Sequence, residues 1–148
     1  MHEQWQEGEI TGSTERRWMP VYRAPRHQHV LGVTPSGTFV EGAKGTVVLS
    51  ETSGIRFLFL LEHPLDEVRS AVRSGLAAAG LQDVSFPVSS IVAAGLRSEM
   101  EYWASLAASW LEQDGEQHPS LQNLISDVVA SGWASQQTRH RLRRFLRP

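Results

Sequence analysis

Turn-forming spacers divide the first half of the chain into short apolar runs. Spacers of about four residues with glycine or proline lie at 34–37, 42–45 and 51–54. Connections of this length and chemistry join the two strands of a hairpin, so neighbouring runs are expected to pair antiparallel. The runs rich in β-branched and aromatic residues, and therefore the expected strands, are 18–23, 29–33, 38–41, 46–50 and 55–61. The last run is apolar on both faces in its second half, which predicts a central strand covered by helices.

The second half of the chain has helical periodicity instead. Pro64 and two acidic residues form a favourable first turn, apolar residues then recur at three- and four-residue spacing, and Gly80 supplies the stop. Similar patterns predict three further helices, at about 96–113, 120–130 and 135–146. The segment 83–88 is expected to be an extended link or a sixth strand.

Strands followed by helices predict an α+β domain. We expect an N-terminal antiparallel β-meander of four to five strands followed by about four helices packed on one face. With 148 residues, of which 41% are apolar and 20% charged, the chain has the size and composition of a single globular domain. Within this domain, residues 1–17 are polar enough to form a loose arm, 18–61 are β-rich and 64–148 are mainly helical.

Several classes of enzyme and cofactor site need residues that this sequence does not contain. The absence of cysteine excludes disulfides, thiolate zinc sites, iron–sulfur clusters and thiol nucleophiles. No G-x-S-x-G motif, Walker A loop or G-x-G-x-x-G loop occurs. We therefore expect neither catalysis nor a cofactor. The N-terminus lacks the pattern of a signal peptide and the longest apolar run is too short to cross a bilayer, so a cytoplasmic protein without membrane association is expected.

Two histidines have a spacing that can chelate a metal. His27 and His29 would lie on one face of a strand, and His63 could supply a third ligand. Such a pair is common by chance, however, and no fourth ligand lies nearby in the sequence. The favoured interpretation is that these are turn and surface histidines, with no metal site.

The last ten residues are strongly basic although the chain as a whole is slightly acidic. Five of the fourteen Lys and Arg residues lie there, whereas residues 1–138 hold the other nine and all sixteen Asp and Glu residues, a net charge of −7. On a helix from 135 to 146, arginines four residues apart would share a face and could contact nucleic-acid phosphates. Cations in a last turn also stabilise the helix dipole, which needs no ligand. Both interpretations concern Arg139, Arg141, Arg143, Arg144 and Arg147.

Aromatic and acidic residues outside the expected core point to a protein partner. An exposed tryptophan beside an arginine is typical of a binding hot spot, and an acidic surface suits a basic partner. The candidates for partner binding are Trp5, Trp18, Glu3, Glu7, Glu9, Glu15 and Tyr102. We expect a non-catalytic protein-binding module, for example a small bacterial immunity or adaptor-type protein that masks its partner by occlusion. The alternatives are self-association and a nucleic-acid-binding accessory protein that uses the C-terminal arginines.

Overall fold

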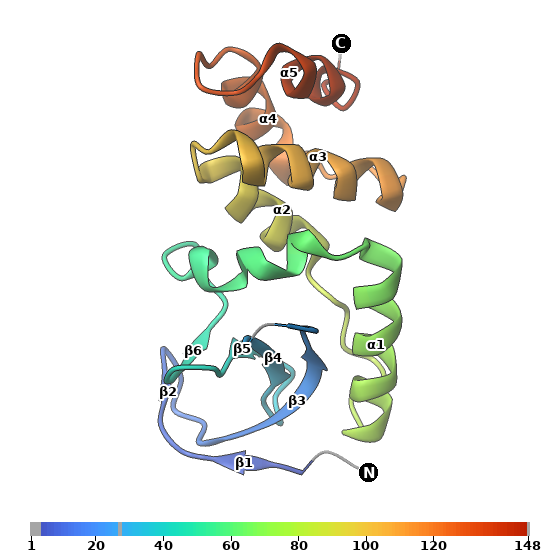
Figure 1. Cartoon of the computed structure of the whole chain (residues 1–148). Helices are drawn as coiled ribbons and strands as arrows, with labels where there is room; N and C mark the ends of the chain where they lie inside the picture. The colour runs from blue at the N-terminus through green and yellow to red at the C-terminus, as the bar shows by residue number, and fades with distance from the viewer. Residues whose placement is uncertain (1–3, 27, 148) are drawn as a thin grey trace.

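The computed structural model describes residues 4–26 and 28–147 and confirms the α+β class (Figure 1). Four strands form the expected antiparallel meander and two more lie at its edges, in the order β1-β3-β4-β5-β6-β2. Every pairing is antiparallel except that of β2 with β6. The strands are β1 Gln6–Glu7, β2 Ile10–Thr11, β3 Arg17–Arg23, β4 Val30–Val33, β5 Phe39–Glu41 and β6 Thr46–Val48.

The prediction of a loose N-terminal arm is wrong for the part of it that the structure describes. β1 pairs with β3 at one edge of the sheet, and β2 pairs with β6 at the other. These two short strands are consecutive in sequence, so the sheet must curl until its edges approach each other, as Figure 1 shows. The side chain of Ile10 is buried inside the curl, because it packs with Val30, Val40 and Val48. This burial holds the segment in place.

Trp18, which was predicted to contact a partner, is buried in the same small cluster and is only 9% exposed. Its indole ring fills the space left by two glycines. A Cβ atom at Gly32 would lie 2.3 Å from ring atom Cε3, and one at Gly42 would lie 2.4 Å from Cη2. Glycine within a strand often permits such a close approach. Trp18 therefore belongs to the interior, and the prediction of an exposed side chain is wrong.

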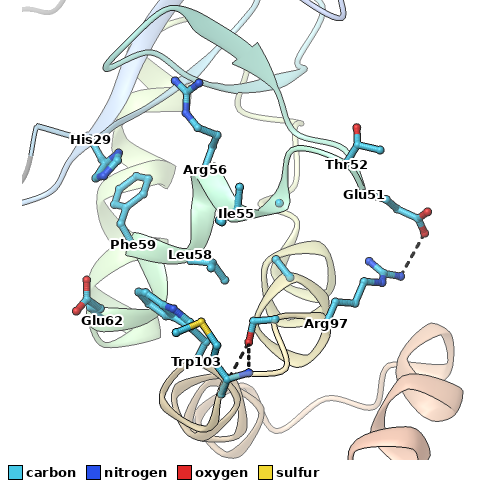
Figure 2. A pocket seen from close by; sticks show the side chains of 14 residues that line it. His29, Glu51, Thr52, Ile55, Arg56, Leu58, Phe59, Glu62, Arg97 and Trp103 are labelled. Carbon is cyan, nitrogen blue, oxygen red and sulfur yellow. Dashed lines mark hydrogen bonds and ion pairs between the residues drawn. The ribbon is translucent and has the colours of Figure 1, made fainter.

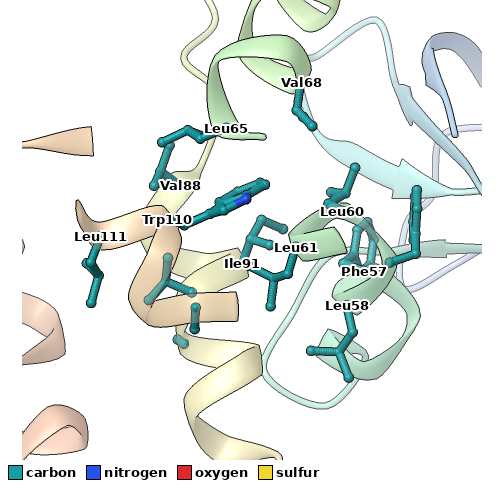
Figure 3. Packing of buried hydrophobic residues seen from close by; sticks show 14 of the residues in the cluster. Phe57, Leu58, Leu60, Leu61, Leu65, Val68, Val88, Ile91, Trp110 and Leu111 are labelled. Carbon is teal, nitrogen blue, oxygen red and sulfur yellow. The ribbon is translucent and has the colours of Figure 1, made fainter. Parts of the chain in front are cut away.

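The expected final strand at 55–61 is wrong as well, because this segment is the 3₁₀ helix η1, Gly54–Glu62. Its apolar run has no alternation, and a run without a period does not distinguish a buried strand from a buried helix. Side chains three residues apart are aligned in a 3₁₀ helix. Phe57 and Leu60 form one such row and are fully buried in the main core, as Figure 3 shows. Ile55 and Leu58 begin a second row, and Arg56, Phe59 and Glu62 form the third.

The helical half is divided more finely than the sequence indicated. The first helix lies where it was expected, and 83–87 is the link rather than a sixth strand. The helix predicted at 96–113 begins later, as α3, and the helix α2 that precedes it across a corner was not predicted. The last helix also ends earlier than predicted. The elements are α1 Leu65–Ala78, α2 Val88–Arg97, α3 Glu101–Asp114, the 3₁₀ turn η2 Pro119–Leu121, α4 Gln122–Val129 and α5 Gln136–Arg143.

The helices form successive layers above the sheet (Figure 1). α1 packs against β3, whereas η1 contacts α2 and α3, and α3 in turn contacts α5. α2 and α3 approach closely at Gly95, where a Cβ atom would lie 3.0 Å from that of Ala107. The indole Nε1 of Trp110 donates to the carbonyl of His63 at 2.9 Å, which fixes α3 to the end of η1. Among the described residues, no helix has the length and apolar character needed to cross a membrane.

Candidate binding groove

A groove of about 600 Å³ opens between η1, α2 and the beginning of α3 (Figure 2). We call it the apolar groove, because most of its floor is hydrophobic. His29 and Arg56 lie at the end nearest the sheet, and Trp103 and Glu62 lie on the side of α3. The apolar residues that line it are Ile55, Leu58, Phe59, Ala94, Met100 and Trp103.

The large hydrophobic side chains that are exposed in the described part of the chain gather at this groove. Ile55 is 76% exposed and Met100 is 54% exposed, and both line it. Tyr102, also 54% exposed, packs edge-to-face on Trp103 with a centroid distance of 4.9 Å. Single exposed apolar residues are ordinary on a protein surface, whereas a contiguous patch often marks a binding site.

The corner between α2 and α3 places Met100 at the groove. Glu99 has a left-handed backbone with φ of 56°, and Met100 is extended. The hydroxyl of Ser98 donates to the carbonyl of Gly95 at 2.7 Å and accepts from the amide of Met100 at 3.1 Å. These bonds stabilise the corner locally. Met100 shares the three- and four-residue apolar spacing that predicted the helix at 96–113, a spacing typical of buried positions, yet its side chain is exposed.

Two pairs of side chains hydrogen-bond at the rim, and one of them is an ion pair. Arg97 donates to Glu51 at 3.2 Å across the mouth of the groove, and both are exposed. The hydroxyl of Tyr102 donates to Glu62 at 2.6 Å. This hydrogen bond raises the pKa of Tyr102 above its ordinary value. The rim is therefore polar but close to neutral, which is the composition of many protein-binding surfaces.

A buried carboxylate lies beneath the sheet end of the groove. The side chain of Glu41, at the end of β5, is fully buried. Its Oε1 accepts from Arg56 Nε at 2.7 Å and from Arg56 Nη2, and its Oε2 accepts from the amide of Ala43 at 2.8 Å and that of Val30 at 3.3 Å. The imidazole Nδ1 of His29 lies 3.5 Å from Oε2, and its ring stacks on Phe59 at 4.8 Å. Glu41 thereby holds both Arg56 and His29 in position.

A second buried carboxylate, Asp114, lies away from the groove and ties α1 to the end of α3. Arg69 and His118 each approach it at 2.5 Å. Burial raises the pKa of Asp114, but the hydrogen bonds from Arg69 and His118 lower it more, so the net pKa is below its ordinary value. Because Arg69 and His118 both pair with Asp114, we interpret this cluster as a structural one.

The partner-binding residues predicted from sequence do not come together. Trp5 is half-buried, with the Arg17 guanidinium 5.0 Å from its ring centre, and Glu7 and Glu9 are exposed near β1. Glu15 accepts from the amide of Ser36 at 3.1 Å and from its hydroxyl at 2.7 Å. Tyr102 is on α3, at a distance from β1 along the molecule (Figure 1). Glu3 lies outside the described residues.

The C-terminal arginines are not equivalent to one another. Arg141 Nη2 donates to Glu112 at 2.7 Å and to Ser109 at 2.8 Å, so it is engaged within the protein. Arg139 is half-buried. Arg139 and Arg143 both lie on α5, four residues apart as expected, but the helix ends at Arg143, so the prediction that Arg147 continues this row on the same helix is wrong. The exposed members are Arg143, Arg144 and Arg147.

The predicted histidine pair can be assessed only in part, because His27 lies outside the described residues. His29 stacks on Phe59, whereas His63 packs edge-to-face against Tyr22 with a centroid distance of 5.9 Å. Within residues 4–26 and 28–147, no group of three or more His, Asp and Glu residues could hold a metal ion.

Comparison of the chain with protein-family models, with curated proteins and with solved structures finds no match. The assignment of a function therefore depends on the groove itself. Sequence reasoning missed Ile55, Arg56 and Met100 as parts of it. One signal was present, because an apolar residue between two acids, as Met100 is between Glu99 and Glu101, is typical of an exposed position.

Proposed function

We propose that this protein is a non-catalytic protein-binding module and that the apolar groove receives its partner. The observation that carries this proposal concerns the exposed large hydrophobics of the described chain: Ile55 and Met100 line one concave surface, and Tyr102 packs beside it on Trp103. Aromatic and methionine side chains are enriched in interfaces, and a concave apolar surface suits a helix or an extended segment. Full burial of a large apolar side chain contributes about 1.5–3 kcal/mol.

The pairing of the rim charges supports binding over chemistry. Glu51 and Arg97 form an ion pair, and the Glu62 carboxylate accepts from the uncharged hydroxyl of Tyr102, so each of these groups already has a partner within the protein. The groove also has a volume typical of a recognition site. A narrower role, such as a bacterial immunity or adaptor-type protein that occludes its partner, stays a prediction, as does a cytoplasmic location.

The proposal is tested by affinity capture with matched variants. The groove variant Ile55→Asp/Met100→Asp changes two exposed side chains, so it should fold as the wild type does. The control variant Trp5→Ser/Glu7→Gln alters the surface that the sequence indicated. We expect a partner in stoichiometric amount with the wild type and the control, and its loss with the groove variant. A partner that is retained by the groove variant and lost by the control would move the binding surface to β1.

Nucleic-acid binding through the C-terminus stays a prediction, supported by the exposure of Arg143, Arg144 and Arg147. Neutralising a phosphate contact weakens binding and reduces its salt dependence. The test is a titration with random duplex DNA at about 50 and 200 mM salt, with these three arginines changed to Gln in a control protein. Binding that does not change with salt or in the variant would exclude this role.

A further inference from the structure

A second hollow continues the apolar groove towards the sheet. It has a volume of about 450 Å³ and shares His29 and Arg56 with the groove. Arg26 and Lys44 complete its charged lining, and Gln28 and Ala43 lie between them. We call this hollow the basic pocket. Because two side chains border both spaces, the groove and the basic pocket are adjacent, and an extended ligand in the groove would have its next residues beside the basic pocket.

The charge of the basic pocket is opposite to that of the surrounding protein. Residues 1–138 contain nine basic and sixteen acidic side chains, yet three of those nine, Arg26, Lys44 and Arg56, line this one pocket. The acidic group that faces it, Glu41, is fully buried and pairs with Arg56. An acidic segment repelled by the rest of the body would therefore be attracted here.

Arg56 is held in an orientation that suits recognition of a carboxylate. Its Nε and Nη2 bind Glu41, and Nη2 also donates to the carbonyl of Gly45 at 2.7 Å. Its Nη1 makes no hydrogen bond to the described residues, so one donor of a fixed guanidinium is left for a ligand. A side chain that is ordered before binding loses less conformational entropy when the ligand arrives. Lys44 and Arg26 are exposed and add mobile positive charge beside it.

We propose that the apolar groove and the basic pocket form one continuous site for a partner-protein segment in which apolar side chains are followed by acidic ones. The apolar side chains pack on Ile55, Met100 and Trp103, and the carboxylates meet Arg56, Lys44 and Arg26. This inference rests on the proposed function, since it names the partner chemistry of the same groove. It differs from the basic partner that the acidic N-terminal residues suggest.

The experiment is a display selection with random twelve-residue peptides on four forms of the full chain. These are the wild type, the groove variant Ile55→Asp/Met100→Asp, the pocket variant Arg26→Glu/Lys44→Glu, and the control Arg143→Glu/Arg144→Glu. The last two carry the same change in net charge at exposed positions. We expect the wild type and the control to enrich peptides that combine apolar residues with Asp or Glu. The pocket variant should lose these peptides and select Lys or Arg instead.

The best peptide is then synthesised and its Kd is measured by fluorescence anisotropy at two salt concentrations. Reversal of two charges should weaken binding at least about tenfold, and the loss should be larger at low salt. Inorganic phosphate added as a competitor distinguishes a small-anion site. Displacement of the peptide by millimolar phosphate, together with no requirement for its apolar residues, would overturn the proposal.

Different outcomes overturn the acidic-segment inference and the proposed function. Apolar peptides without an acidic bias would leave the groove as a binding site but overturn the acidic-segment inference. Acidic peptides that bind the pocket variant and the wild type equally tightly would also overturn this inference, because Arg26 and Lys44 would then not contribute to their recognition. If the wild type enriches no peptides relative to the groove variant, the proposed function itself is overturned.

Discussion

Glu41→Gln is the substitution that most directly tests how the sheet end of the groove is held. Four hydrogen-bond donors reach the Glu41 carboxylate: two guanidinium nitrogens of Arg56 on Oε1 and two backbone amides on Oε2, with His29 Nδ1 farther away at 3.5 Å from Oε2. Glutamine keeps the shape of the side chain but offers one oxygen and one NH2 group. In either orientation the NH2 group faces donors, so one pair of donors loses its acceptor.

The expected cost is about 3 kcal/mol in the free energy of unfolding. Removing one partner from a buried ion pair costs about 3–5 kcal/mol, because the other charge is left without compensation. The Arg56 side chain is 31% exposed, so water solvates part of the charge that is left behind and the lower end of this range applies. Since a domain of this kind is stable by about 5–15 kcal/mol, the loss is large.

Urea denaturation followed by tryptophan fluorescence measures this change. With a slope of about 1.5 kcal/mol per molar urea, the midpoint should fall by about 2 M. Glu51→Gln is the matched control, because Glu51 also pairs with an arginine but is 81% exposed, and it should cost less than about 0.5 kcal/mol. A loss below about 1 kcal/mol for Glu41→Gln, well short of the buried-pair cost, would refute the reasoning. Arg56→Met should then add little in the Glu41→Gln background, and full additivity would show that the two side chains are not coupled.

Three further substitutions test other parts of the structure. Gly42→Ala forces a methyl group against the Trp18 ring and should cost about 1–3 kcal/mol by overpacking. Gly132→Ala is the control: no atom lies within 4 Å of its added Cβ, so it should be neutral or slightly stabilising in the same urea denaturation experiment. Asp114→Asn should be less stable than the wild type at neutral pH. Because folding lowers the pKa of Asp114, this difference in stability should shrink as the pH falls below 3.8, the ordinary pKa of the carboxyl group. A constant difference in urea titrations from pH 7 to pH 3 would contradict the assignment. Tyr22→Phe should leave the midpoint unchanged or raise it, since the buried hydroxyl has no hydrogen-bond partner among the described residues, and a loss above about 1 kcal/mol would reveal one.

Local signals in the sequence predicted much of the fold. The meander from β3 to β6 follows from short apolar and β-branched runs separated by turns that contain glycine or proline, and α1 follows from its periodicity and Gly80. The 3₁₀ helix at 55–61 could not be predicted in this way, because a run of five apolar residues is equally compatible with a buried strand and a buried helix. The burial of Trp18 depends on Gly32 and Gly42, which are distant from it in sequence and meet it only when β3, β4 and β5 pair in the sheet.

The candidate site was less accessible to prediction than the fold. The groove joins the beginning of η1 to the corner before α3, segments more than forty residues apart, and no local pattern encodes that approach. The pairing of Glu41 with Arg56 has the same origin, since one residue ends a strand and the other begins a helix. The exposure of Tyr102 was predicted correctly, because its position on α3 falls outside the apolar stripe.

The 3₁₀ helix also limits how the length of this chain can change during evolution. Each residue of η1 turns the chain by about 120°, so an insertion or deletion of one residue within it would move every later side chain of the helix to a different row. Arg56, Phe59 and Glu62 would no longer share a line, and Phe57 and Leu60 would leave the core. Only an insertion or deletion of three residues restores the alignment of the rows, and such a change would lengthen or shorten the floor of the apolar groove by one full turn of η1. Related chains should therefore vary in length in the turns of the sheet and keep η1 constant.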